Sequence, residues 1–316
     1  MNDYAWLPAD LRAFVARTEA HDPPEGVAAS IDRQREAYDR MCRDFDGPIA
    51  ETLELDDLRI AGVPCRWYRP RRREPAERRP VALYLHGGGF VLGGLHSHDS
   101  ICADLAARSE VELVAVDYRL APEHPHPAAF DDAVAVLQAL NMDCVLVGDS
   151  AGGNLAAALS ARPDLTQIRG QILIYPGLGG DPHQPSMRHH AEAPLLRAAD
   201  VAAYHRLRAG PEGTPVDITA APLAAVDFSS LPPTEIFAAE CDPLASDAVG
   251  YAQRLAAASV AVRLTIEPFL MHGYLRARGC SLHGHAAFDR IARALAQLVN
   301  HEAEAGRSVA SAAGKR

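Results

Sequence analysis

The segment 145–155 constrains the fold more than any other part of the chain. It reads Val-Leu-Val-Gly-Asp-Ser-Ala-Gly-Gly-Asn-Leu, so an apolar run ends in the pattern Gly-x-Ser-x-Gly and a helix-prone segment of small residues follows. The two glycines leave room for the backbone to fold back from a strand into a helix. This layout is typical of a nucleophile elbow, in which a strained turn exposes a serine hydroxyl at the end of a strand. The pattern therefore predicts a strand, a tight turn at Ser150 and a helix, with Ser150 as a nucleophile.

Strand-like and helix-like segments alternate through most of the chain. Apolar runs predict strands at 81–85, 111–117, 143–149, 169–175, 234–240 and 261–267. Helix-prone stretches lie near 98–108, 128–140, 151–162, 245–258 and 284–302. This alternation favours an α/β fold with a mainly parallel sheet and helices on both faces. A hairpin around Ala61-Gly62 gives the sheet an antiparallel start.

Two longer segments interrupt this alternation. Residues 1–48 show amphipathic helical spacing and no strand, whereas 179–230 is an insertion between two predicted strands. The insertion leaves the sheet at the edge where catalytic loops should emerge, so we expect both segments to form a helical cap. An N-terminal arm that only packs on the core is the alternative for 1–48. The expected parts are cap helices at 1–48, a core at 49–178 and 231–302, a cap insertion at 179–230 and a disordered tail at 303–316.

The charge of the chain argues against several partners. The formal net charge is −10 at pH 7, and such a field repels nucleic acid and anionic membranes. The arginine-rich stretch 71–79 also holds glutamates between two predicted strands, which favours a solvated loop over a phosphate site. We therefore expect no nucleic-acid partner and no membrane partner, while formation of a homo-oligomer stays open.

The cysteines and the first residues indicate the compartment. Six cysteines lie far apart without a Cys-x-x-Cys pair, which is not the density of a disulfide scaffold. The start of the chain lacks the cationic region and the apolar run of a signal peptide, and no apolar stretch approaches membrane-spanning length. We expect reduced thiols in a cytoplasmic protein.

A glycine-rich segment follows the predicted strand at 81–85. It begins His86-Gly87-Gly88-Gly89-Phe90, and three consecutive glycines let the backbone approach a site closely. Acyl transfer needs N–H donors aimed at the developing oxyanion, and an HGGG-type loop beside a nucleophile elbow supplies them. We expect these donors to be the N–H groups of Gly88, Gly89 and Ala151. A phosphate-binding loop is the alternative, but the glycine spacing and the missing Lys-Ser/Thr disfavour it.

Two later residues complete the predicted chemistry. In folds with this elbow an acid and then a histidine follow the nucleophile, each after a later strand. Asp242 follows the predicted strand at 234–240, and His272 follows the last predicted strand. Asp247 is the nearest competitor for the acid, but it lies where the next helix should begin, where aspartate is more often an N-cap. We expect Asp242 to hold the imidazole tautomer and His272 to take the proton from Ser150.

Other histidines occur in close pairs that could suggest metal ligands. The pairs are His189-His190, His124 with His126, and His283 with His285. None has an acidic or thiol partner at the spacing of a metal site, so we expect surface or capping roles and no metal.

The motifs occur together in an order that resembles a known family. They are His86-Gly87-Gly88-Gly89-Phe90, Asp117-Tyr118-Arg119-Leu120-Ala121-Pro122-Glu123-His124-Pro125, Gly148-Asp149-Ser150-Ala151-Gly152-Gly153-Asn154, Asp242-Pro243-Leu244 and His272-Gly273. Across most of its length the chain looks like the hormone-sensitive-lipase family of α/β-hydrolase esterases, and within it is most similar to bacterial acetyl-esterase-like carboxylesterases. The resemblance implies an α/β-hydrolase fold with a helical cap. It also implies a triad of Ser150, Asp242 and His272 and an oxyanion hole of Gly88, Gly89 and Ala151.

The same resemblance implies a function. A serine carboxylesterase of this family would hydrolyse small esters of short to medium acyl chain through an acyl-enzyme, without a cofactor or metal. An amidase or a thioesterase uses identical machinery, so both stay open. A non-catalytic ligand-binding protein on this fold is disfavoured, because Ser150, Asp242 and His272 are all present.

Overall fold

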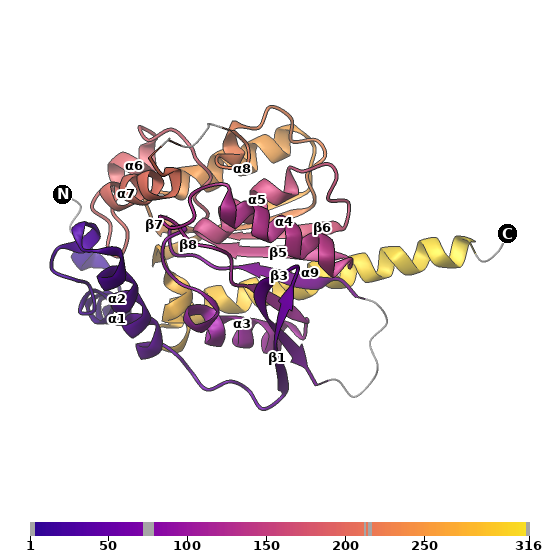
Figure 1. The fold of residues 1–316 in the computed structure, drawn as a ribbon, viewed down its shortest axis with the longest axis horizontal. Helices are drawn as coiled ribbons and strands as arrows, with labels where there is room; N and C mark the ends of the chain where they lie inside the picture. Colours follow the sequence, from indigo (N-terminus) through magenta and orange to yellow (C-terminus); the bar gives the residue numbers. More distant parts are fainter. Residues whose placement is uncertain (1–3, 72–78, 212, 214–216, 314–316) are drawn as a thin grey trace.

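The computed structural model describes residues 4–71, 79–211, 213 and 217–313. Most of the loop expected at 71–79 therefore lies outside the described residues. Within them, eight strands form one sheet in the order β1-β2-β4-β3-β5-β6-β7-β8 (Figure 1). The strands are β1 (Leu53–Ile60), β2 (Val63–Pro70), β3 (Val81–Leu85), β4 (Leu113–Val116), β5 (Cys144–Asp149), β6 (Ile168–Ile174), β7 (Thr234–Cys241) and β8 (Val262–Met271).

The sheet is parallel from β4 to β8 and antiparallel at its start. Strand β2 pairs antiparallel with both β1 and β4, and every other neighbouring pair is parallel. All residues of β3 and β5 are buried, as expected for central strands covered on both faces. The predicted α/β fold with an antiparallel opening hairpin is confirmed.

Helices cover both faces of the sheet and bury two separate apolar clusters. The helices on one face are α3 (Leu95–Ser109) and α9 (Leu282–Ala313), and those on the other are α4 (Ala128–Leu140), α5 (Ala151–Ser160) and α8 (Ala245–Ala257) (Figure 1). Because neighbouring residues of a strand point to opposite faces, Ala82 and Tyr84 join the first cluster while Leu83 and Leu85 join the second.

The remaining helices lie outside this sandwich. They are α1 (Ala9–Glu19), α2 (Ile31–Asp44), α6 (Pro185–His189) and α7 (Ala198–Ala209), with short 3-10 turns η1 (Tyr4–Trp6), η2 (Gly26–Ala28), η3 (Pro222–Ala224) and η4 (Tyr274–Gly279). Helix α2 begins after Ser30, whose hydroxyl accepts a hydrogen bond from the N–H of Arg33. Figure 1 shows α1, α2, α6 and α7 gathered at the same end of the sheet.

The end of the chain differs from the expected tail. Helix α9 continues through residues 303–313 and extends beyond the sheet, whereas 314–316 lie outside the described residues (Figure 1). This stretch is rich in alanine, and the high helix propensity of alanine lets the helix continue without an apolar repeat.

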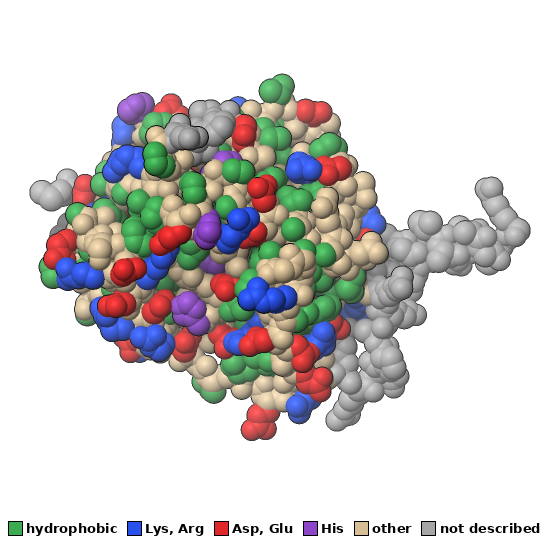
Figure 2. All heavy atoms as spheres, in the orientation of Figure 1, with side chains coloured by type: hydrophobic (Ala, Val, Ile, Leu, Met, Phe, Trp, Pro, Cys, Tyr) green, Lys and Arg blue, Asp and Glu red, His purple; other side chains and the backbone are tan. Residues whose placement is uncertain are grey.

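The surface shows mixed charge. Acidic and basic side chains are interspersed on the face drawn in Figure 2, without a basic stripe. Among the described helices, none combines the length and the apolar character that crossing a bilayer requires.

Candidate active site

Ser150 occupies a tight turn between β5 and α5. Its φ of +52° lies in the left-handed region, which residues with a side chain rarely adopt. A Cβ at Gly152 would lie 1.8 Å from the carbonyl oxygen of Leu85, and a Cβ at Gly148 would lie 2.3 Å from the backbone of Gly152. Both positions therefore require glycine, and the strand, turn and helix predicted around Ser150 are present.

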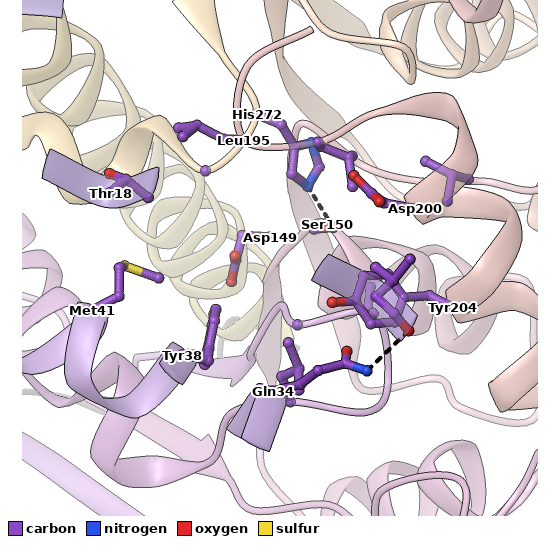
Figure 3. Close-up of a pocket in the computed structure, with 18 of the residues that line it drawn as sticks. Thr18, Gln34, Tyr38, Met41, Asp149, Ser150, Leu195, Asp200, Tyr204 and His272 are labelled. Atoms are coloured by element: carbon purple, nitrogen blue, oxygen red, sulfur yellow. Dashed lines mark hydrogen bonds between the residues drawn. The ribbon is translucent and has the colours of Figure 1, made fainter. Parts of the chain in front are cut away.

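Ser150, His272 and Asp242 form one chain of hydrogen bonds. His272 Nε2 lies 2.8 Å from Ser150 Oγ (Figure 3). His272 Nδ1 lies 2.8 Å from Asp242 Oδ2. Asp242 directly follows β7 and is 1% exposed, and its other oxygen accepts a hydrogen bond from the N–H of Leu244. With Nδ1–H donating to Asp242, His272 Nε2 is free to accept the serine proton. Such an arrangement can generate a serine nucleophile.

The glycine loop lies beside the serine. Gly88 and Gly89 have φ values of +120° and +61°, and a Cβ at Gly89 would lie 2.6 Å from the ring of Tyr204. The three predicted donors, Gly88, Gly89 and Ala151, therefore border the same pocket as Ser150.

A family model described as the alpha/beta hydrolase fold matches residues 82–276. The match covers more than half of the chain and includes Ser150, Asp242 and His272. The chain belongs to this family of alpha/beta hydrolases.

Named relatives refine this assignment. An ethyl acetate hydrolase of Pseudomonas putida is 34% identical over 85% of this hydrolase and 92% of its own length. Esterase LipI of Mycobacterium tuberculosis is 38% identical over 78% of this hydrolase and 83% of its own length. A solved esterase of the bacterial hormone-sensitive lipase family superposes with a TM-score of 0.80 at 26% identity, over 92% of this hydrolase and 99% of that chain. The predicted resemblance and the predicted enzyme class, a carboxylic ester hydrolase, are confirmed.

Asp149 lines the pocket and is a residue that the sequence patterns did not single out. It precedes Ser150 in the hydrolase, is buried, and accepts hydrogen bonds from the Gly87 N–H at 2.9 Å and the Tyr84 hydroxyl at 2.8 Å. Burial alone would raise the pKa of Asp149, but the nearby His98, the Tyr84 hydroxyl and the charge of Arg276 hold it below its usual value. Its place between the glycines of the elbow is the only signal in the sequence.

Asp247 does not cap α8, so that expectation was wrong. It is the third residue of the helix, after the N-cap position at Leu244. Its carboxylate accepts hydrogen bonds from the N–H groups of Leu178 at 2.6 Å and Gly180 at 3.3 Å, and from the side-chain amide of Gln184. Asp247 thus fastens the start of the 179–230 insertion to the core, apart from His272.

The pocket beside Ser150 is lined mainly by apolar and aromatic side chains. Tyr38 and Met41 come from α2, Tyr204 comes from α7, and Leu195 precedes α7. Figure 3 shows these four side chains around Ser150. Both segments expected to form a cap therefore border the pocket.

The paired histidines do not belong to a group of metal ligands among the described residues. Within the described ranges, no group of three or more His, Cys, Asp or Glu side chains is arranged to hold a metal ion. His190 Nδ1 instead lies 2.9 Å from the hydroxyl of Tyr4, and His126 Nε2 lies 3.1 Å from the hydroxyl of Thr219.

Proposed function

We propose that Ser150, His272 and Asp242 carry out the ester hydrolysis of this carboxylic ester hydrolase. The observation that carries the proposal is the continuous chain of hydrogen bonds from Ser150 Oγ through the imidazole to Asp242, at 2.8 Å for each contact. Nucleophile, base and orienting acid are thereby each within hydrogen-bond reach of the next.

Acylation begins at the serine. His272 Nε2 takes the proton as Ser150 Oγ bonds to the ester carbonyl carbon, and the N–H groups of the oxyanion loop and Ala151 stabilise the oxyanion. His272 then gives this proton to the alcohol oxygen as the carbon–oxygen bond breaks, which leaves an acyl-enzyme. His272 then takes a proton from water as the water oxygen bonds to the acyl carbon, and it returns this proton to Ser150 Oγ as the bond between that carbon and Oγ breaks. The carboxylic acid leaves and Ser150 is restored. Asp242 stabilises the His272 imidazolium during both acylation and deacylation.

We propose small esters with short to medium acyl chains as substrates. The apolar lining of the pocket suits an aliphatic or aromatic substrate. A relative named for the hydrolysis of ethyl acetate supports the lower end of this range. The helices α1, α2 and α7 would act as a cap over such substrates, and the free cysteines support a cytoplasmic setting.

The test compares the wild-type hydrolase with the variant Ser150→Ala. The substrates are p-nitrophenyl esters of graded acyl length, together with a matched anilide and a matched thioester. We expect wild type to cleave the shorter esters fastest, and Ser150→Ala to lose this activity while keeping its melting temperature. Retained ester hydrolysis in Ser150→Ala would overturn the mechanism, and faster cleavage of the anilide or thioester would reassign the preferred bond.

A further inference from the structure

Arg208 is a buried arginine at the end of α7. It is 5% exposed, and burial lowers its pKa to about 10, so it keeps its charge at neutral pH. Its hydrogen-bond partners among the described residues are all neutral: the carbonyl oxygens of Thr219 and Ala220, the amide oxygen of Asn154 and the ring of His126. Burying a charge in this way is costly unless polar groups surround it, so its position needs an explanation.

The contacts of Arg208 reach both halves of the proposed site. Its Nη2 donates to Asn154 Oδ1 at 3.2 Å, and its guanidinium carbon lies 3.7 Å from the centre of the Phe90 ring. A guanidinium over an aromatic face is attracted by the ring, and more strongly when both are desolvated. Arg208 therefore contacts one residue of α5 and one residue of the glycine loop.

Phe90 is the residue next to the proposed oxyanion donors. It directly follows Gly89 and has a φ of +66°, which costs energy for a residue with a bulky side chain. Its carbonyl accepts a hydrogen bond from Ala121, so its backbone is fixed on one side and its ring by Arg208 on the other. Because Gly89 and Phe90 share a peptide bond, a displacement of the Phe90 backbone would also displace Gly89.

Asn154 stands one helical turn after the nucleophile. Its backbone N–H donates to the carbonyl of Ser150 at 3.1 Å, and its side-chain amide donates to the carbonyl of Gly177 at 2.8 Å. Arg208 binds the oxygen of the same amide. A single guanidinium thus contacts both the helix that follows Ser150 and the residue that follows Gly89.

We propose that Arg208 is a positioning residue for ester hydrolysis, which holds Phe90 and α5 so that the Gly88 and Gly89 N–H groups face the oxyanion formed at Ser150. The inference rests on the oxyanion hole of the proposed function. Phe90 lines the pocket, whereas Arg208 is not among its described lining residues, so Arg208 acts without touching substrate. Oxyanion donors act only when they meet the developing charge, so their displacement lowers kcat more than it changes KM.

The test replaces Arg208 by methionine, which fills a similar volume without charge. The matched control is Arg206→Met, because Arg206 is an exposed arginine on the same helix. We expect Arg208→Met to lower kcat about a hundredfold, as for a small misplacement of reacting groups, with little change in KM. The affinity for a trifluoromethyl ketone, which forms an oxyanion on Ser150, should fall in parallel. Arg206→Met should match wild type in all three measurements.

A second variant, Arg208→Lys, keeps the test valid if Arg208→Met folds poorly. Arg208→Lys keeps the charge and can donate to carbonyl oxygens, but it lacks the planar face that covers Phe90. We expect its kcat, measured per folded molecule, to fall between those of wild type and Arg208→Met. A wild-type kcat and ketone affinity in both Arg208 variants would overturn the inference.

The Ser150 and Arg208 variants together separate the positioning role of Arg208 from the proposed function. If Ser150→Ala is inactive and the Arg208 variants keep full kcat, only the positioning role is wrong. If Ser150→Ala keeps ester hydrolysis, the proposed function is wrong, and the positioning role falls with it.

Discussion

Asp149 Oδ1 accepts a 2.9 Å hydrogen bond from the backbone N–H of Gly87. Asp149 immediately precedes the serine of the elbow, and Gly87 immediately precedes the loop glycines proposed as oxyanion donors. One buried carboxylate therefore connects the proposed nucleophile to the proposed oxyanion hole.

Replacing this carboxylate should impair turnover more than substrate binding. Asp149→Asn keeps one oxygen to accept from Gly87 and Tyr84, but it removes the negative charge that faces His98. We expect kcat to fall about tenfold or more, with a lower melting temperature, because buried donors lose a charged acceptor. Asp143→Asn, an exposed change just before the same strand, should leave both quantities at wild-type values. Equal kcat in the two variants would contradict the connecting role of Asp149.

The two aspartates after β7 should differ sharply in their effect on rate. In Asp242→Asn the side-chain amide would donate to His272 Nδ1 and force the proton onto Nε2, which then cannot accept from Ser150. We expect kcat to fall about ten-thousandfold. Asp247→Asn keeps an oxygen for the N–H of Leu178 and should mainly lower the melting temperature. Steady-state kinetics and thermal unfolding of both variants check this, and the opposite ranking of kcat would move the acid to Asp247.

Those parts of the site could be predicted whose sequence patterns lie within a few neighbouring residues. The strand, turn and helix around Ser150 lie within a few residues, and the loop at Gly88 and Gly89 directly follows a fully buried strand. Asp242 and His272 could be placed because the order of acid and histidine after later strands is a property of the fold.

The sequence patterns missed Asp149 and Arg208 and misassigned Asp247, because all three depend on distant partners. Asp247 binds the segment after β6, Asp149 binds the loop after β3, and Arg208 binds both that loop and α5. Nothing in the spacing around these residues encodes such contacts, because a buried charge is stabilised by groups that only the folded chain brings near.

Acid should destabilise the protein through its buried histidines. Burial lowers the pKa of His86 to about 3, whereas an unfolded histidine has a pKa of about 6.5. The unfolded chain therefore binds more protons between these values, so the contribution of His86 to stability is complete above pH 6.5 and is lost as the pH falls toward 3. Melting temperatures measured from neutral pH downward should decline, and His86→Asn should show a shallower decline. Parallel curves for the two proteins would exclude His86 as a cause.

Gly152 should tolerate no side chain. It packs so closely on β3 that a Cβ would lie 1.8 Å from the carbonyl oxygen of Leu85 and 2.8 Å from that of His86. Backbone atoms of a buried central strand cannot yield by that amount, so Gly152→Ala should push α5 away from the sheet and displace Ser150. We expect severe loss of stability and, in any folded fraction, of kcat. Gly47→Ala is the matched control, because its Cβ would meet nothing within 4 Å and its backbone is not left-handed. Thermal unfolding and ester hydrolysis of the two variants test this prediction. A Gly152→Ala protein as stable and as active as Gly47→Ala would refute the close contact.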